Sequence, residues 1–151
     1  MATAGVHVKS TVEVEVNVPQ ATLAALFADP RLCKEWMDDL DRYEPISGAP
    51  GMPGSTYRLV PKTGRMVFVV TVQTRNLPND VRLSLDASNV TVAVTATFSA
   101  VESTRSRLRS EEVFTFKGAL NKLGGFFAQQ VIRNAHRRHI HAFKRYAEQR
   151  G

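Results

Sequence analysis

The chain has 151 residues, 43% of them hydrophobic and 23% charged, which is the composition of a folded globular domain and excludes a long disordered or repetitive protein. A chain of this length forms one domain, so residues 1–151 are predicted to be a single domain, and the lone Cys33 excludes an intramolecular disulfide. The formal net charge of +6 leaves an anionic partner open but is more simply explained by a basic, solvated surface.

The first predicted element is a strand over residues 6–18. Valine occupies almost every even position and a polar residue every odd one, which is the period of a strand with one buried face. Two short helices are expected next, because Pro19 suits a first helical position and Asp29 followed by Pro30 is a second start signal. The apolar side of the second helix carries Leu32, Cys33, Trp36 and Met37.

A loop at residues 48–54, rich in glycine and proline, leads into a region of strands. Segments rich in Val, Thr, Phe and Leu predict strands over residues 55–60, 66–75, 81–86, 90–101 and 105–116. The connections are short turns, so consecutive strands are expected to pair as an antiparallel meander. In residues 90–101 apolar side chains alternate with mainly hydroxylic ones, so one face should pack and the other meet water.

After Gly118 apolar residues recur every three or four positions from Leu123 to Tyr146, which predicts a helix of about seven turns with a basic back. It is the only large amphipathic element available to cover the apolar face of the sheet. One helix is too narrow for that task. A sheet that curls around it, closed at one end by the two short helices, leaves a pocket suited to an apolar ligand.

Three segments carry a resemblance to a known family: VNVPQATLAALFADPRLCKEW at residues 16–36, STYRL at residues 55–59 after the glycine- and proline-rich turn, and HRRHIHAFKRYAE at residues 136–148. They resemble the opening strand and helix pair, the third strand and the end of the last helix of the SRPBCC superfamily. That superfamily includes START lipid-transfer domains, pollen-allergen-like proteins and polyketide cyclases.

The resemblance implies an α+β helix-grip fold, with a six- or seven-stranded antiparallel sheet curled around a long C-terminal helix and two short helices after the first strand. It also implies a deep cavity between the sheet and the last helix. Elsewhere in the superfamily such cavities hold sterols, lipids, quinones or polyketides, and enzymes are a minority. Fold alone does not transfer function.

Glu112 is the candidate catalytic or anchoring residue. Parity along residues 105–116 places it on the inward face with Leu108 and Phe114. A carboxyl in apolar surroundings has a raised pKa, which suits an acid or a ligand anchor near neutral pH. The alternative is that Glu112 lies near a rim or pairs with an arginine.

The predicted cavity walls are aromatic and aliphatic, and for the aromatic residues plain core packing is the alternative. The residues expected to line the cavity are Trp36, Tyr43, Tyr57, Leu59, Phe68, Val70, Leu83, Leu85, Val94, Phe98, Glu112, Phe114, Phe127 and Val131.

No metal site and no cofactor are predicted. His136, His139 and His141 lie on one helix, but no carboxylate lies among them and they lack the HExxH arrangement. A buried or partly buried helix histidine is the better interpretation.

We therefore predict a protein that binds or transports a small hydrophobic ligand, such as a lipid, a quinone or a polyketide-like aromatic. The alternative is a cyclase or dehydratase in the same cavity, with Glu112 or a cavity tyrosine handling a proton. A second alternative is an interaction module in which Arg105, Arg107 and Arg109 join the basic back of the helix in an anion-binding patch.

The expected partner is thus a small molecule. Nucleic acid is not favoured, because the basic residues lack a matched aromatic platform. No apolar run approaches the ~18 residues of a membrane-spanning helix and no signal sequence is evident, so a cytoplasmic protein is predicted. A transient contact with a membrane surface is left open, and the sequence gives neither the ligand nor the oligomeric state.

Overall fold

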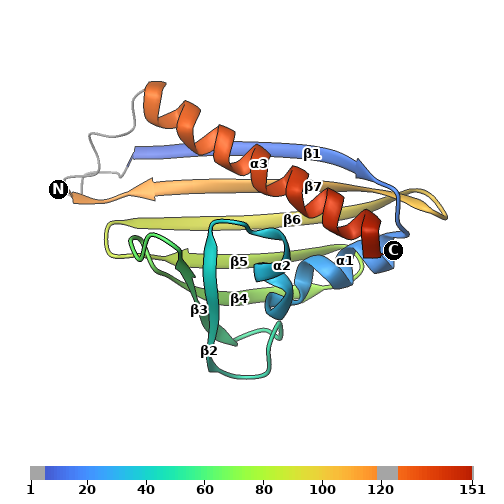
Figure 1. Cartoon of the computed structure of the whole chain (residues 1–151), viewed down its shortest axis with the longest axis horizontal. Helices are drawn as coiled ribbons and strands as arrows, with labels where there is room; N and C mark the ends of the chain where they lie inside the picture. Colours follow the sequence, from blue (N-terminus) through green and yellow to red (C-terminus); the bar gives the residue numbers. More distant parts are fainter. Residues whose placement is uncertain (1–5, 119–125, 151) are drawn as a thin grey trace.

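The computed structural model describes the backbone of residues 6–118 and 126–150 and the side chains of residues 7–118 and 128–150. Its elements follow one another as shown in Figure 1. They are β1 (Val6–Val16), α1 (Gln20–Ala28), the 3-10 helix η1 (Pro30–Leu32), α2 (Cys33–Trp36), β2 (Leu40–Ser47), β3 (Thr56–Pro61), β4 (Phe68–Asn76), β5 (Asp80–Asp86), β6 (Val90–Glu102), β7 (Arg105–Phe116) and α3 (Phe126–Arg150).

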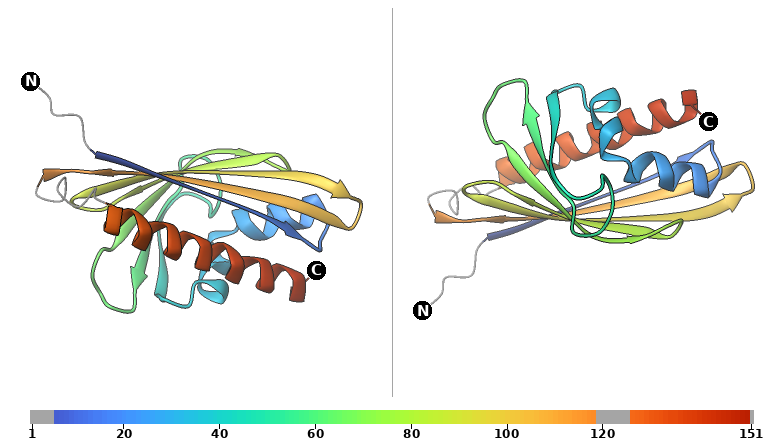
Figure 2. Two further views of the ribbon diagram at one scale, coloured as in Figure 1. Left: turned by 90° about the horizontal axis from the view of Figure 1, so that it is seen from above. Right: turned by 90° about the horizontal axis from the view of Figure 1, so that it is seen from below.

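The seven strands form one antiparallel sheet in the order β1-β7-β6-β5-β4-β3-β2. The helices lie on one face of it, and β2 and β3 curl towards that face (Figure 2). The register of β2 against β3 shifts twice, and such irregularities bend strands. The expected helix-grip fold is therefore confirmed.

β2 is the strand for which the sequence predicted no range, although six or seven strands were expected. Its segment contains Asp41, Arg42, Glu44 and Pro45, and residues of these types are not typical strand formers. β2 lies at the edge of the sheet, where a proline removes no interior hydrogen bond. Pairing with β3 creates the strand despite its composition.

Other boundaries differ from the predicted ones by one or two residues, as is usual where strand ends fray. β1 ends at Val16 and β4 begins at Phe68. The start signal at Asp29 is confirmed, because its carboxylate accepts a hydrogen bond of 3.0 Å from the backbone N–H of Arg31. Leu123, the first residue of the predicted helical pattern, lies outside the described residues.

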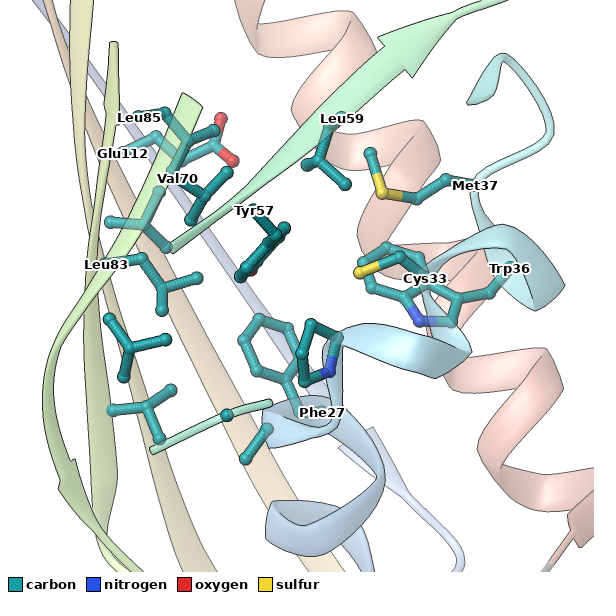
Figure 3. Close-up of a pocket in the computed structure, with 16 residues that line it drawn as sticks. Phe27, Cys33, Trp36, Met37, Tyr57, Leu59, Val70, Leu83, Leu85 and Glu112 are labelled. Carbon is teal, nitrogen blue, oxygen red and sulfur yellow. The ribbon is translucent and has the colours of Figure 1, made fainter. Parts of the chain in front are cut away.

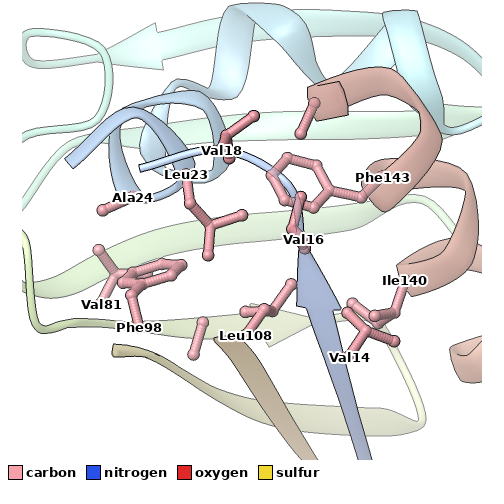
Figure 4. Close-up of a cluster of buried hydrophobic side chains, with 12 residues drawn as sticks. Val14, Val16, Val18, Leu23, Ala24, Val81, Phe98, Leu108, Ile140 and Phe143 are labelled. Carbon is pink, nitrogen blue, oxygen red and sulfur yellow. The ribbon is translucent and has the colours of Figure 1, made fainter. Parts of the chain in front are cut away.

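The main core lies where α1 and α3 meet the sheet (Figure 4). The alternation in β1, β6 and β7 buries one side chain in two, and these pack against Leu23 of α1 and Phe143 of α3. The ring centroid of Phe143 lies 5.2 Å from those of Phe27 and Trp36. One aromatic ring of α3 thus holds both short helical segments in place.

The opposite face of the sheet carries a ladder of ion pairs. Arg107 lies 3.0 Å from Glu15 and 3.5 Å from Glu13. Arg105 pairs with Glu102 at 2.9 Å, and Arg109 lies 3.8 Å from Glu111. The alternative of a joint anion-binding patch with the back of α3 is therefore not supported, because these arginines lie on the face of the sheet opposite α3 and pair with acidic neighbours.

Truncation of the core ring should be costly. Phe143 is fully buried, so Phe143→Ala is expected to lower the free energy of unfolding by about 3–5 kcal/mol. Val131→Ala on the same helix, at a side chain with 55% exposure, should change it by less than about 0.5 kcal/mol. Urea denaturation followed by circular dichroism measures both, and equal losses would contradict this view of the core.

Candidate functional site

A cavity lies between the inner face of the sheet, α2 and α3. It has an inner chamber of about 90 Å³ and an outer chamber of about 350 Å³. Four residues line both chambers, and we call them the waist: Met37, Leu59, Leu85 and Glu112. The two chambers therefore adjoin at the waist, and we refer to them together as the two-part cavity.

The inner chamber is apolar and lies beneath the short helices (Figure 3). Cys33 and Trp36 face it from α2, while Val70, Leu83 and Tyr57 face it from the strands. Tyr57 is 4% exposed and its hydroxyl has no hydrogen-bond partner among the described residues. Trp36 also brings a polar atom, since its indole Nε1 is buried without a hydrogen-bond partner among the described residues; the rest of the lining outside Tyr57 and the waist is almost wholly apolar.

The outer chamber opens to solvent between α3 and the β3–β4 turn. Met66 of the turn is 51% exposed and Val131 of α3 is 55% exposed, so the mouth has an apolar rim. At the same chamber, both carboxylate oxygens of Asp39 lie within 3.2 Å of Nε2 of His139, which ties the segment after α2 to α3. Arg65 also lines this chamber.

Glu112 projects from β7 into the waist, as strand parity predicted (Figure 3). Burial raises the pKa of its carboxyl to about 7, because the charged form loses hydration. The nearest ionisable group is His136, whose Nε2 lies 3.8 Å from a carboxylate oxygen. No arginine pairs with Glu112 among the described residues, so the alternative of an arginine pair is not supported.

The hydrogen bonds of His136 explain why the carboxyl of Glu112 has no positively charged partner. The ring of His136 is buried, with Nδ1 2.8 Å from the hydroxyl of Ser10 and Nε2 2.9 Å from that of Ser110. Burial, with a smaller effect from the charge of His139, lowers the pKa of His136 to about 4. The imidazole is neutral at neutral pH, so it donates to one serine and accepts from the other. It joins α3 to β1 and β7 and supplies no positive charge to Glu112.

The structure places most of the predicted wall residues along this cavity, and their role as ligand contacts stays a prediction. Those that line a chamber are Trp36, Tyr57, Leu59, Phe68, Val70, Leu83, Leu85, Val94, Glu112, Phe114 and Val131.

Two predicted wall residues line neither chamber, and a third cannot be compared. Tyr43 packs behind Tyr57, with 5.2 Å between ring centroids, and lines neither chamber. Phe98 belongs to the main core, edge-on to Phe27 at 5.7 Å. The side chain of Phe127 lies outside the described residues. Strand alternation predicted the correct face for Phe98 but not its position along the strand.

The sequence analysis missed several wall residues. Cys33 and Met37 share the apolar side of α2 with Trp36, and that pattern could have identified them. Arg65 and Met66 lie in the β3–β4 turn. The predicted strand over residues 66–75 included Met66, but no sequence signal marked either residue as part of the wall. His136 was expected to be buried, but its serine partners come from distant strands.

The remaining reactive groups offer little chemistry. Burial raises the pKa of the Cys33 thiol to about 12, so it is protonated and unreactive at neutral pH. Burial also raises the pKa of Tyr57 well above its ordinary value of 10.0. Within the described ranges, no cluster of three or more His, Cys, Asp or Glu residues could hold a metal ion. No helix in that part of the chain is long and apolar enough to span a membrane.

Comparison with known proteins yields one family match and many structural ones. Residues 7–148 match the family described as polyketide cyclase / dehydrase and lipid transport. The structure is similar to a START superfamily protein from Mycobacterium smegmatis, with a TM-score of 0.80 and 14% identity over 95% of this chain and 99% of that chain.

Two further solved structures are similar. One is a norcoclaurine synthase from Thalictrum flavum, with a TM-score of 0.73 and 12% identity over 99% of both chains. The other is Ara h 8.0201, with a TM-score of 0.71 and 15% identity over 93% of this chain and 97% of that chain. At such identities the likeness shows the fold alone. The chain has no significant match among curated proteins.

The raised pKa of Glu112 makes stability depend on pH. The neutral carboxyl stabilises the fold fully below its ordinary pKa of 4.5, and this contribution is lost as the pH rises to about 7. Relative to Glu112→Gln, the wild type should therefore lose about 3 kcal/mol of unfolding free energy across this window.

Urea unfolding at a series of pH values measures this difference. Glu111→Gln is the matched control, because Glu111 points to the opposite face, where it lies 3.4 Å from Lys9. That variant should keep the wild-type slope. Parallel curves for the wild type and Glu112→Gln would show that Glu112 titrates normally.

Proposed function

Because the chain belongs to the polyketide cyclase / dehydrase and lipid transport family, we propose that it binds and carries one small hydrophobic molecule in the two-part cavity. The observation that carries this proposal is an apolar cavity with an open mouth. The outer chamber of about 350 Å³ falls within the range of about 300–1,000 Å³ that is typical of small-molecule sites. Lipids, quinones and polyketide-like aromatics are the candidate classes.

Binding needs no chemistry beyond what the walls supply. Each Å² of apolar ligand surface removed from water contributes about 25 cal/mol. Most polar groups near the cavity already have partners: His136 holds two serines, and His139 holds Asp39. Glu112 remains as a polar anchor at the waist, and the Tyr57 hydroxyl and the Trp36 Nε1 remain as donors in the inner chamber. The apolar rim of Met66 and Val131 suits a transient contact with a membrane surface during loading, and a cytoplasmic carrier fits the buried, reduced Cys33.

A second candidate is an enzyme of the cyclase or dehydratase type. One observation favours it: with a pKa of about 7, Glu112 can take up and release a proton near neutral pH. Tyr57 stays protonated at neutral pH, since burial raises its pKa further, so it could form hydrogen bonds with a substrate but not act as a base. The two candidates differ in the effect of Glu112→Gln: a carrier keeps its ligand, whereas an enzyme keeps binding but loses turnover.

Native mass spectrometry of freshly purified protein, followed by denaturation and organic extraction, tests the proposal. We expect one apolar molecule per chain, or saturable binding of the fluorescent probe N-phenyl-1-naphthylamine to the empty protein. The absence of both would contradict a carrier. Binding to an acidic polymer that salt abolishes would instead favour an interaction module.

A pair of variants on β6 localises the probe. Val92 lines the outer chamber, so Val92→Phe should fill part of it and weaken probe binding about tenfold or more. Ala93→Phe is the matched control, because its side chain is exposed on the other face of the same strand. Equal affinities of the two variants would place the probe elsewhere.

A further inference from the structure

The waist restricts the chemistry of any molecule that extends through both chambers. Three of its residues, Met37, Leu59 and Leu85, carry no charge and no strong hydrogen-bonding group. The fourth is Glu112. In the sheet Glu112 lies opposite Ser10 of β1 and Val94 of β6, and it lines both chambers. The middle of such a molecule therefore meets a single polar group.

The groups that face Glu112 leave its carboxyl without a charged partner. From α3, His136 is neutral and bonded to Ser10 and Ser110, and His139 is held by Asp39. On the inner side Tyr57 of β3 and Cys33 of α2 are uncharged at neutral pH.

On the outer side, the one cation besides the histidines is Arg65 of the β3–β4 turn, which forms no ion pair with Glu112. No hydrogen bond to the carboxyl is formed within residues 7–118 and 128–150. With a pKa of about 7, Glu112 is largely neutral at slightly acid pH. A neutral carboxyl group carries an O–H donor, and nothing in the described part of the protein accepts it.

The sizes of the two chambers indicate which part of a ligand each chamber can hold. The inner chamber, at about 90 Å³, is smaller than the cavity of about 150 Å³ that takes up benzene in an engineered core. It accommodates a short alkyl tail better than a ring. The outer chamber of about 350 Å³ has room for a fused ring system.

We propose that the ligand is an uncharged molecule in two parts, with a ring-bearing body in the outer chamber, a short alkyl tail in the inner chamber, and between them an oxygen that accepts a hydrogen bond from Glu112. This inference rests on the proposed carrier function and specifies its ligand class. Aryl alkyl ketones and related carbonyl compounds have this form. A molecule with a carboxylate at the same point would be repelled once Glu112 ionises.

Two matched probes test the inference. 1-(2-Naphthyl)butan-1-one has a naphthalene body, a carbonyl and a propyl tail, and 2-butylnaphthalene replaces the carbonyl with a methylene group. Their dissociation constants are measured at pH 5.5 and pH 8.5 by displacement of N-phenyl-1-naphthylamine. In the wild type, the preference for the ketone over the hydrocarbon should be about tenfold greater at pH 5.5, where Glu112 can donate.

The variants separate Glu112 from other titrating groups. Glu112→Gln keeps a donor at both pH values, so the preference for the ketone should no longer change with pH. The Glu112→Gln variant also retains His139. Any effect of His139 on the ketone preference is therefore still measured in this variant and can be subtracted from the change in the wild type. Glu112→Leu, which suits an apolar waist, should favour the hydrocarbon at both pH values. Glu111→Gln should behave like the wild type.

Each outcome has a distinct meaning. If N-phenyl-1-naphthylamine binds the wild type but neither probe displaces it, the carrier proposal stands and the inference about the ligand is overturned; if none of the three molecules binds, the carrier proposal itself fails. If both bind and the ketone preference of the wild type is the same at both pH values, the carrier proposal stands and the inference about Glu112 is overturned. If the preference changes equally in Glu112→Gln, another group is responsible and the inference is likewise overturned.

Discussion

A single helix cannot cover the inner face of a seven-stranded sheet, and the architecture of this protein follows from that mismatch. α3 covers the β1 and β7 side and is fastened there by Phe143 and by the bonds of His136. The other strands must hide their apolar face in another way. β2 and β3 curl over, and α2 closes the remaining end. The space that these elements enclose is wider than their side chains can fill, and that space is the cavity.

The same mismatch determines where a polar side chain can line the cavity. Every second residue of β7 points inward, so the strand that contributes Leu108 to the core also contributes Glu112 to the waist. Buried charge is normally compensated by an ion pair or a change of protonation. Here His136 is occupied by two serines, so compensation occurs by protonation of the carboxyl. The hydrogen bonds of His136 that hold α3 on the sheet and the titrating carboxyl of Glu112 in the cavity are thus parts of one arrangement.

The sequence predicted the fold well because its signals are local and periodic. Alternating valines in β1 and β6 and the apolar period of α3 each reflect burial of one face, and Pro19 and Pro30 mark where α1 and η1 begin because a proline suits a helix start. The inward direction of Glu112 followed from the same parity. β2 was missed because its pairing, and not its composition, makes it a strand. Phe98 was wrongly assigned to the cavity wall because strand alternation predicts the face of the sheet on which a residue lies. It does not predict how far along the strand the cavity extends.

The candidate site was harder to predict for a related reason. Its walls come from six strands, three α-helices, the 3-10 helix and connecting segments, and no sequence period relates Arg65 or Met66 to α3. The two-serine environment of His136 depends on strand register across β1 and β7. A residue belongs to the waist only because of the residues that lie across the cavity from it. A single sequence does not show which residues those are. The fold was therefore predictable to the level of elements, and the cavity only to the level of its apolar character.

The fastening of His136 also limits how such a chain can change over time. An imidazole bonded at both nitrogens gives α3 one rotational setting against the sheet. Inserting one residue into the helix before His136 would turn the preceding wall residues Ile132 and Ala135 by about 100° away from the cavity. An insertion or deletion in this part of the helix therefore changes several wall residues at once and not one at a time. New ligand preferences are accessible mainly through substitutions along the wall or through the β3–β4 turn, which can vary in length without disturbing the helix.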